Sequence, residues 1–160
     1  MTLAEDISLL IRVPLFSDLS SDHLRLLAFS AIRLELPEGR VLFRKDAAAM
    51  SGFVVMHGEV EFVDMDKPEP LPLGRYGPGA LLGETALFVE TRRPATARAA
   101  TDCDLVEIDR NLMRRMLNEY PDVAARLHTR LVDKLAGSVA EVGRVKARLD
   151  AIIYPPARAN

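Results

Sequence analysis

The sequence predicts a mainly β domain with flanking helices, built as an antiparallel sandwich or roll and extended by one long C-terminal helix. Between residues 32 and 109, short runs of alternating apolar and polar residues follow one another, separated by turn signals. On both sides of this region, apolar residues recur at helical spacing. The length of 160 residues suits one compact domain.

Two short helices are expected before the first strand. Thr2 is followed three residues later by Glu5, which is the pattern of a capping box at a helix start. A second helix is expected to begin at Ser20 or Ser21, because the apolar residues after it fall on one helical face. We expect this pair to pack on the β-rich region.

The central region contains seven predicted strands. They are IRLEL, VLF, GFVVM, EVEFV, LGRY, ATARA and DLVEI, in chain order. Turn signals such as Pro37-Glu38-Gly39 and Gly77-Pro78-Gly79 separate them. Many short strands at even spacing are typical of antiparallel sheets, so a parallel sheet is not expected.

A helical pattern returns after Asp109 and continues, after Pro121, to about Ile153. Apolar residues repeat there at heptad spacing, and the predicted seam consists of His128, Leu131, Leu135, Ser138, Val142, Val145, Leu149 and Ile152. The seam predicts a homodimer through this helix; the alternative is that the face packs back onto the chain's own β-region. We therefore expect a β-domain with its N-terminal helices over 1–120, a dimerisation helix over 121–153 and a flexible tail over 154–160.

Composition excludes several classes of protein. With 21 basic and 23 acidic side chains the net charge is −2, which is not the footprint of a nucleic-acid binder. No apolar stretch approaches the roughly 18 residues of a membrane span, and no signal pattern opens the chain, so we expect a cytoplasmic protein with no membrane contact. The lone Cys103 is expected to be buried as a small apolar residue.

One segment, YGPGALLGETALFVETRRPATARA at 76–99, breaks the strand rhythm. Gly83-Glu84 opens a short apolar helical turn whose first N–H groups lack internal partners and can hold an anion. Arg93 follows, and its planar guanidinium suits a phosphate. Together with the acceptor Glu84, this pattern indicates a ribose phosphate ligand. The alternative is a solvated loop in which Glu84 and Arg93 pair with each other.

This segment resembles the phosphate-binding cassette of the cyclic-nucleotide-binding domain family, whose pattern is Gly-Glu, a short apolar helix, then Arg followed by small residues and Thr. The resemblance runs from about Leu9 to Leu149 and is strongest to the sensor domains of bacterial Crp/Fnr-type regulators. It implies an antiparallel β-roll of the double-stranded β-helix or jelly-roll type, with N-terminal helices and a long dimerisation helix.

The resemblance also implies roles for individual residues. Glu84 would bind the ribose 2′-hydroxyl, and Arg93 would bind the cyclic phosphate. Backbone amides at Gly83, Thr85, Ala86 and Ala95 would complete the cradle, Leu73, Leu82 and Ala97 would form the apolar wall, and Ser138 would place a hydroxyl near an adenine amino group. For Ser138 the alternative is a serine simply tolerated at the seam. Arg92 is expected to be solvated.

Pro94 departs from the family pattern. The residue after the arginine usually offers a backbone N–H to the phosphate, and proline has none. Loss of one charge-assisted hydrogen bond costs about 1.5–3 kcal/mol, so we expect weakened rather than abolished binding.

We therefore expect a regulatory sensor that binds a cyclic nucleotide, cyclic AMP in the first place, and signals by rearranging its C-terminal helix. The alternatives are a ligand-free dimerisation or protein-interaction domain that keeps the fold, and a remote enzyme.

We expect no catalytic residues, no enzymatic activity, no cofactor and no metal, since His23, His57 and His128 lack ligand spacing. The chain ends where transcription factors of this type continue into a DNA-binding module, so no DNA binding by this chain alone is expected. The nucleotide's identity and the output partner stay open.

Overall fold

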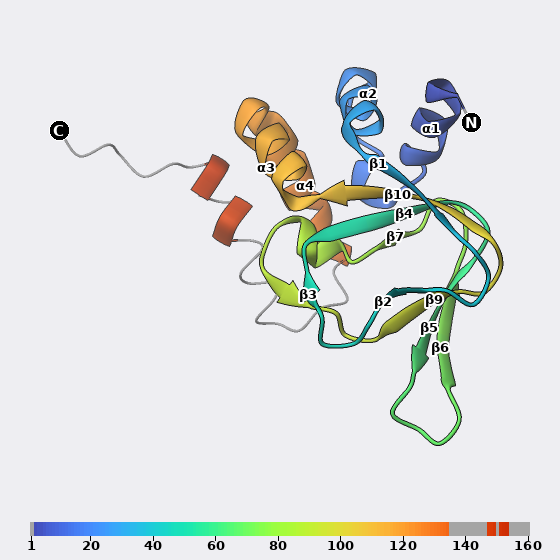
Figure 1. Cartoon of the computed structure of the whole chain (residues 1–160). Coiled ribbons are helices and arrows are strands. Elements are labelled where there is room, and N and C mark those ends of the chain that lie inside the picture. Colours follow the sequence, from blue (N-terminus) through green and yellow to red (C-terminus); the bar gives the residue numbers. More distant parts are fainter. Residues whose placement is uncertain (1, 135–146, 150, 154–160) are drawn as a thin grey trace.

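The computed structural model describes residues 2–134, 147–149 and 151–153. The helices α1 (Leu3–Leu10), α2 (Ser21–Ser30) and α3 (Arg110–Glu119) lie toward one side of the β-strands (Figure 1). The other helical elements are the 3-10 turns η1 (Pro14–Phe16) and η2 (Glu84–Leu87) and the helix α4 (Pro121–Lys134). Within the described residues, no helix has the length and apolar character needed to cross a membrane.

The strands form two four-stranded antiparallel sheets and one two-stranded ribbon. They are β1 (Ile32–Leu36), β2 (Val41–Phe43), β3 (Ala48–Ala49), β4 (Ser51–His57), β5 (Val60–Asp64), β6 (Leu71–Tyr76), β7 (Leu81–Leu82), β8 (Thr91–Arg92), β9 (Thr96–Ala99) and β10 (Cys103–Asp109). The strand orders are β1-β10-β4-β7, β2-β9-β5-β6 and β3-β8. The predicted mainly β antiparallel architecture with flanking helices is therefore confirmed.

The sheet that carries β1 joins the two ends of the β-region. β1 pairs with β10 from Ile32 opposite Glu107 to Leu36 opposite Cys103. β10 then pairs with β4, with an irregularity between Asp104 and Leu105. The strand that enters the β-region and the strand that leaves it are thus neighbours, which places α2 and α3 on the same side (Figure 1).

Two apolar clusters hold this arrangement together. The first joins the helices to the outer face of the β1-β10-β4-β7 sheet, and it includes Phe16, Leu24, Ile108, Met113 and Leu127, all at most 1% exposed. The second fills the space between the two sheets, around Phe53, Val55, Ala97 and Leu105. Burial of these side chains is the main driving force for folding.

The helix starts follow from their capping residues. The Thr2 side chain accepts from the Glu5 N–H and the Glu5 carboxylate accepts from the Thr2 N–H, which is the predicted capping box. Ser20 is the N-cap of α2, and its Oγ accepts from the His23 N–H. Both predicted N-terminal helices are confirmed.

The C-terminal helix differs in part from the expectation. The structure describes α4 to Lys134 and helical residues again at 147–149 and 151–153. Leu149, an expected seam residue, is fully buried in the chain's own first core cluster, and Ile152 packs against that cluster. At these two positions the alternative expectation holds, in which the face packs on its own domain. The seam side chains from His128 to Val145, and the tail at 154–160, lie outside the described residues.

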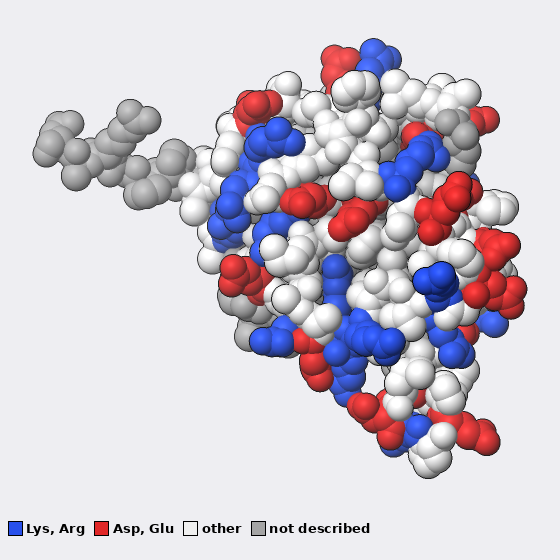
Figure 2. All heavy atoms as spheres, in the orientation of Figure 1, with Lys and Arg blue, Asp and Glu red and all other residues white. Residues whose placement is uncertain are grey.

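The surface carries both signs of charge. Figure 2 shows acidic and basic side chains interspersed over the face in view, in keeping with the net charge of −2. The face in view thus does not present the single-sign field that attracts a polyanion.

Candidate ligand-binding site

The predicted cassette forms a tight turn anchored in the core. Gly83 has a φ of +79°, a left-handed conformation that side-chain-bearing residues rarely adopt, and η2 begins directly after it. The Ala86 N–H donates to the Gly83 carbonyl at 3.2 Å. Ala86, Leu87 and Phe88 are each at most 1% exposed, so burial of the apolar half of the turn fixes its polar half.

Arg93 lies directly beside this turn. Its backbone is fixed on both sides, because its N–H donates to the Ala47 carbonyl at 2.9 Å and its carbonyl accepts from the Asp46 N–H at 2.8 Å. The residue is only 5% exposed. Its Nη2 donates to the Ser51 carbonyl at 2.8 Å, while its buried Nη1 has no hydrogen-bond partner among the described residues. A buried guanidinium thus has an unused donor.

Two aromatic rings hold the plane of this guanidinium. The Cζ of Arg93 lies 4.3 Å from the ring centre of Phe43 and 5.5 Å from that of Phe53. These are cation–π distances. Burial lowers the pKa of Arg93 below its usual value, and the Glu107 carboxylate opposes this shift by favouring the charged form. Glu107 also accepts a hydrogen bond from the Ser51 Oγ at 2.8 Å.

Gly83 and Arg93 depend on each other sterically. A Cβ placed on Gly83 would overlap with Nη1 of Arg93. The absence of a side chain at Gly83 therefore allows the guanidinium to lie against the backbone of the turn. This contact brings a positive charge next to the start of η2.

A second buried arginine connects the turn to the helices. Arg110, the first residue of α3, is 6% exposed, and its Nε donates to the Ala86 carbonyl at 2.7 Å. Its Nη2 donates to the Ala49 carbonyl in β3. The position of η2 is thus tied to the start of α3.

The structure places the predicted site residues as follows. Gly83, Thr85, Ala86 and Arg93 lie together at the turn, with Glu84 as its first residue. Leu82 and Ala97 are buried in the second core cluster, whereas Leu73 is 54% exposed. Arg92 is exposed, with its Nη1 on the Asp46 carbonyl, and Pro94 is exposed beside the half-buried Ala95. Ser138 lies outside the described residues.

Groups from outside the cassette hold the Arg93 guanidinium. They are the Ser51 carbonyl and the Phe53 ring, both in β4, and the Phe43 ring in β2. The guanidinium therefore lies between these strands and the turn that begins at Gly83.

Sequence reasoning missed Ser51, Phe43, Glu107 and Arg110. Ser51 and Arg93 are 42 residues apart, and Arg110 and Ala49 are 61 apart. No local spacing signals such contacts, since they depend on which strands become neighbours. Within the described part of the chain, no three His, Cys, Asp or Glu side chains gather in a way that would hold a metal ion.

The comparisons with known proteins agree with this geometry. The model of the cyclic nucleotide-binding domain family matches residues 33–120. The chain therefore belongs to this family. The match includes the whole of the turn, Arg93 and Arg110.

Individual relatives support the assignment. A cyclic nucleotide-binding-like protein from Brucella abortus is 36% identical with a TM-score of 0.66, covering 71% of this chain and 97% of that one. The catabolite activator protein of Thermus thermophilus is 28% identical with a TM-score of 0.64, covering 74% of this chain and 56% of that one. The regulatory subunit of cAMP-dependent protein kinase from Eremothecium gossypii is 35% identical over 103 residues, which is 64% of this chain. The chain spans 22% of the length of that subunit and 7–9% of the other curated relatives that it matches.

Proposed function

We propose that this chain is a regulatory sensor that binds a cyclic nucleotide, cyclic AMP in the first place, with Arg93 as the ligand of the cyclic phosphate. The observation that carries the proposal is the buried Arg93 Nη1, which lies against the left-handed Gly83 without a hydrogen-bond partner among the described residues. A buried, unsatisfied charged donor costs free energy unless a ligand satisfies it.

The chemistry of the turn supports an anionic ligand with a sugar hydroxyl. Arg93 has no ion pair within the described residues, so its charge is available to a phosphate. The amides at the start of η2 add donors to the same place, and Glu84 supplies an acceptor for the ribose 2′-hydroxyl. A phosphate and a sugar hydroxyl occur together in a ribose cyclic phosphate.

The signal would leave the site through Arg110. Ligand binding at η2 changes the position of the Ala86 carbonyl, and Arg110 transmits that change to α3 and α4. The expected output is a rearrangement of the C-terminal helix, with a coupling free energy of about 1–3 kcal/mol. We propose that the protein acts in the cytoplasm and does so without catalysing a reaction.

The proposal is tested by calorimetric titration of the full chain with cyclic AMP and cyclic GMP. The variant Arg93→Ala should bind at least tenfold more weakly, because it loses the charged phosphate contact. Arg92→Ala is the matched control, since Arg92 is exposed and bonded to the Asp46 carbonyl; it should bind like the wild type.

Pro94 favours a second candidate function, a ligand-free dimerisation domain that keeps the fold, because it removes one donor from the cradle. No binding by the wild type at millimolar ligand would support this candidate and contradict the first. Equal binding by the wild type and Arg93→Ala would contradict the role of Arg93 as the ligand of the cyclic phosphate.

We also propose a homodimer through the heptad positions from His128 to Val145 of the C-terminal helix, since Leu149 and Ile152 pack on the chain's own domain. Sedimentation of Leu135→Lys and Val142→Lys together should give a monomer where the wild type gives a dimer. A wild-type monomer at tens of micromolar would contradict this proposal. It would favour the alternative in which this helix face packs on its own domain, as Leu149 does.

A further inference from the structure

Strand β1 forms an open edge of its sheet. It stands first in the order β1-β10-β4-β7, and β10 is its one neighbour among the described strands (Figure 1). Among the described residues, the backbone of 32–36 makes no backbone hydrogen bond outside that pairing. A hollow of about 470 Å³ lies at this strand, and it is lined by Arg33, Leu34, Glu35, Asp104 and Leu105. A row of free backbone donors and acceptors at such an edge can pair with a further strand.

The other ends of the two four-stranded sheets carry features that hinder such pairing. β7 has only two residues, and β2 has three with an irregular register against β9. β6 contains Pro72, which has no N–H to donate, and its pairing with β5 is irregular. β1 has five residues, no proline and a regular register with β10. It is therefore the edge at which another strand can add most readily.

The sequence of β1, Ile-Arg-Leu-Glu-Leu, complements itself when two copies run antiparallel. With Leu34 on the two-fold axis, Arg33 of each copy lies opposite Glu35 of the other copy. Ile32 of each copy then lies opposite Leu36 of the other. Opposite charges and apolar side chains that face each other across two strands stabilise the pairing. A two-fold axis repeats each of these contacts, so two charge pairs form at once.

Within one chain, Glu35 lacks a favourable partner. The residue directly opposite in β10 is Asp104, a second carboxylate, and like charges in this position repel each other. Glu35 is exposed and has no ion pair among the described residues. Arg33 donates to Asp6 through Nη2, and its side chain is still 46% exposed, which leaves Nε and Nη1 for another carboxylate. Arg33 of a second copy would therefore supply the charge that Glu35 lacks.

The apolar face of β1 continues the core between the two sheets. Leu36 is buried in the second core cluster and Leu34 packs against that cluster. Ile32, on the same face, is 61% exposed, and Phe29 at the end of α2 is 82% exposed. Exposed large apolar side chains close to one another are typical of an association surface. Pairing of two β1 strands would cover Ile32 with Leu36 of the other copy.

We propose that two copies of this chain associate through β1, so that their β1-β10-β4-β7 sheets join into one continuous antiparallel sheet. The contact is separate from the helix contact proposed above and from the turn that holds Arg93. A contact of one strand is small, so we expect a dissociation constant on the order of 0.1 mM. Two different two-fold contacts on one chain would join dimers into larger assemblies.

The test is sedimentation of the full chain carrying Leu135→Lys and Val142→Lys, here called the helix-blocked chain, in which the helix contact cannot contribute. This chain should dimerise at concentrations above the expected dissociation constant. Sedimentation of the wild type would not separate the two contacts, because both involve a second copy of the same chain.

Glu35→Arg in the helix-blocked chain should raise the dissociation constant at least about tenfold, because arginines then face each other in both charge pairs. The fold should be retained, since the new arginine lies opposite Asp104 in its own chain. Glu69→Arg is the matched control. It makes the same change of charge at an exposed residue of the loop between β5 and β6, and it should leave dimerisation unchanged.

A charge exchange gives the sharpest reading. Arg33→Glu alone should also prevent dimerisation, whereas a mixture of Arg33→Glu and Glu35→Arg chains should form a heterodimer with opposite charges in both pairs. If Arg33→Glu fails to fold because Asp6 loses its partner, amide hydrogen exchange replaces it. Exchange of the 32–36 amides in the helix-blocked chain should then slow as concentration rises, while that of β6 should not change.

Two results would overturn the inference. One is a helix-blocked chain that stays monomeric at about 1 mM, ten times the expected dissociation constant. The other is dimerisation of the Glu35→Arg chain as tight as that of its parent. Neither result bears on nucleotide binding, so the proposed function is tested separately by calorimetry.

Discussion

Gly83 and Arg93 form a steric pair: the guanidinium Nη1 occupies the space that a side chain at Gly83 would need. The same glycine has the left-handed backbone from which η2 starts. One residue thus determines both the shape of the turn and the position of the buried charge.

Gly83→Ala should therefore impair both stability and ligand binding. The left-handed conformation costs alanine about 1–2 kcal/mol, and the added methyl group displaces Arg93. We expect a corresponding decrease in the free energy of unfolding in urea and at least tenfold weaker cyclic AMP binding. Gly77→Ala is the control, because Gly77 has no atom within 4 Å of the added methyl group and lacks a positive φ. If the two variants behave alike, the steric pair has no role.

Pro94→Ser should increase the affinity for cyclic AMP, because serine restores an N–H and a hydroxyl beside the phosphate. Pro94 is exposed, so the change does not disturb the core. A restored charge-assisted hydrogen bond contributes about 1.5–3 kcal/mol, or roughly ten- to a hundredfold in the dissociation constant. Pro94→Ala restores the N–H alone and should give an intermediate affinity by calorimetry. Unchanged affinity in both variants would show that the ligand does not approach residue 94.

Arg110→Met should loosen the connection between η2 and α3. It leaves the buried carbonyls of Ala86 and Ala49 without their donor, and we expect a loss of about 2–4 kcal/mol in unfolding free energy. Hydrogen exchange of the η2 amides should accelerate at the same time. Arg114→Met, an exposed change on the same helix, should alter neither quantity. Retained η2 protection in Arg110→Met would exclude this arginine as the connection.

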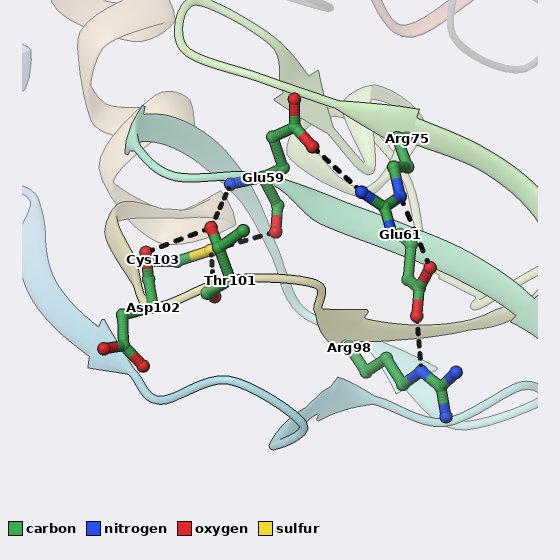
Figure 3. Close-up of polar contacts among 7 residues, drawn as sticks. All are labelled: Glu59, Glu61, Arg75, Arg98, Thr101, Asp102 and Cys103. Carbon is green, nitrogen blue, oxygen red and sulfur yellow. Dashed lines mark hydrogen bonds and ion pairs between the residues drawn. The ribbon is translucent and has the colours of Figure 1, made fainter.

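Cys103 should be unreactive in the folded protein. It is 4% exposed, its Sγ contacts the Glu59 and Thr101 carbonyls (Figure 3), and burial raises the pKa of its thiol. A disulfide reagent at pH 8 should therefore modify it far more slowly than it modifies the chain in urea.

The raised pKa of the Cys103 thiol should make the stability of the fold depend on pH. The thiolate forms more readily in the unfolded chain, so stability should fall as pH rises past the usual thiol pKa of about 8.5 toward the higher folded value. Cys103→Ala should remove this part of the pH dependence in urea melts. Rapid modification of the folded protein would contradict the burial of the thiol.

The longer elements were predictable from sequence because their signals are local. Alternation of apolar residues gave β1 with its observed bounds, and the capping box at Thr2 gave the start of α1. The two-residue strands β3, β7 and β8 were missed, since a strand of two residues has no periodicity and exists only through its partner. The cassette glycine and Arg93 were found from their spacing and family resemblance. The groups that hold Arg93 in place were not, because Ser51 and Phe43 approach it only after the sheets have formed.

The pairing of β1 with β10 also determines how the chain must fold. This contact joins residues 32–36 to residues 103–107, so its formation closes the long loop between them. Closing so long a loop costs chain entropy that local contacts do not repay, so folding should be slow for a protein of this size, on the order of milliseconds to seconds. Arg93, whose partner Ser51 comes from β4 in that sheet, then reaches its final position only late in folding. A ligand that binds the finished site would slow unfolding without accelerating folding.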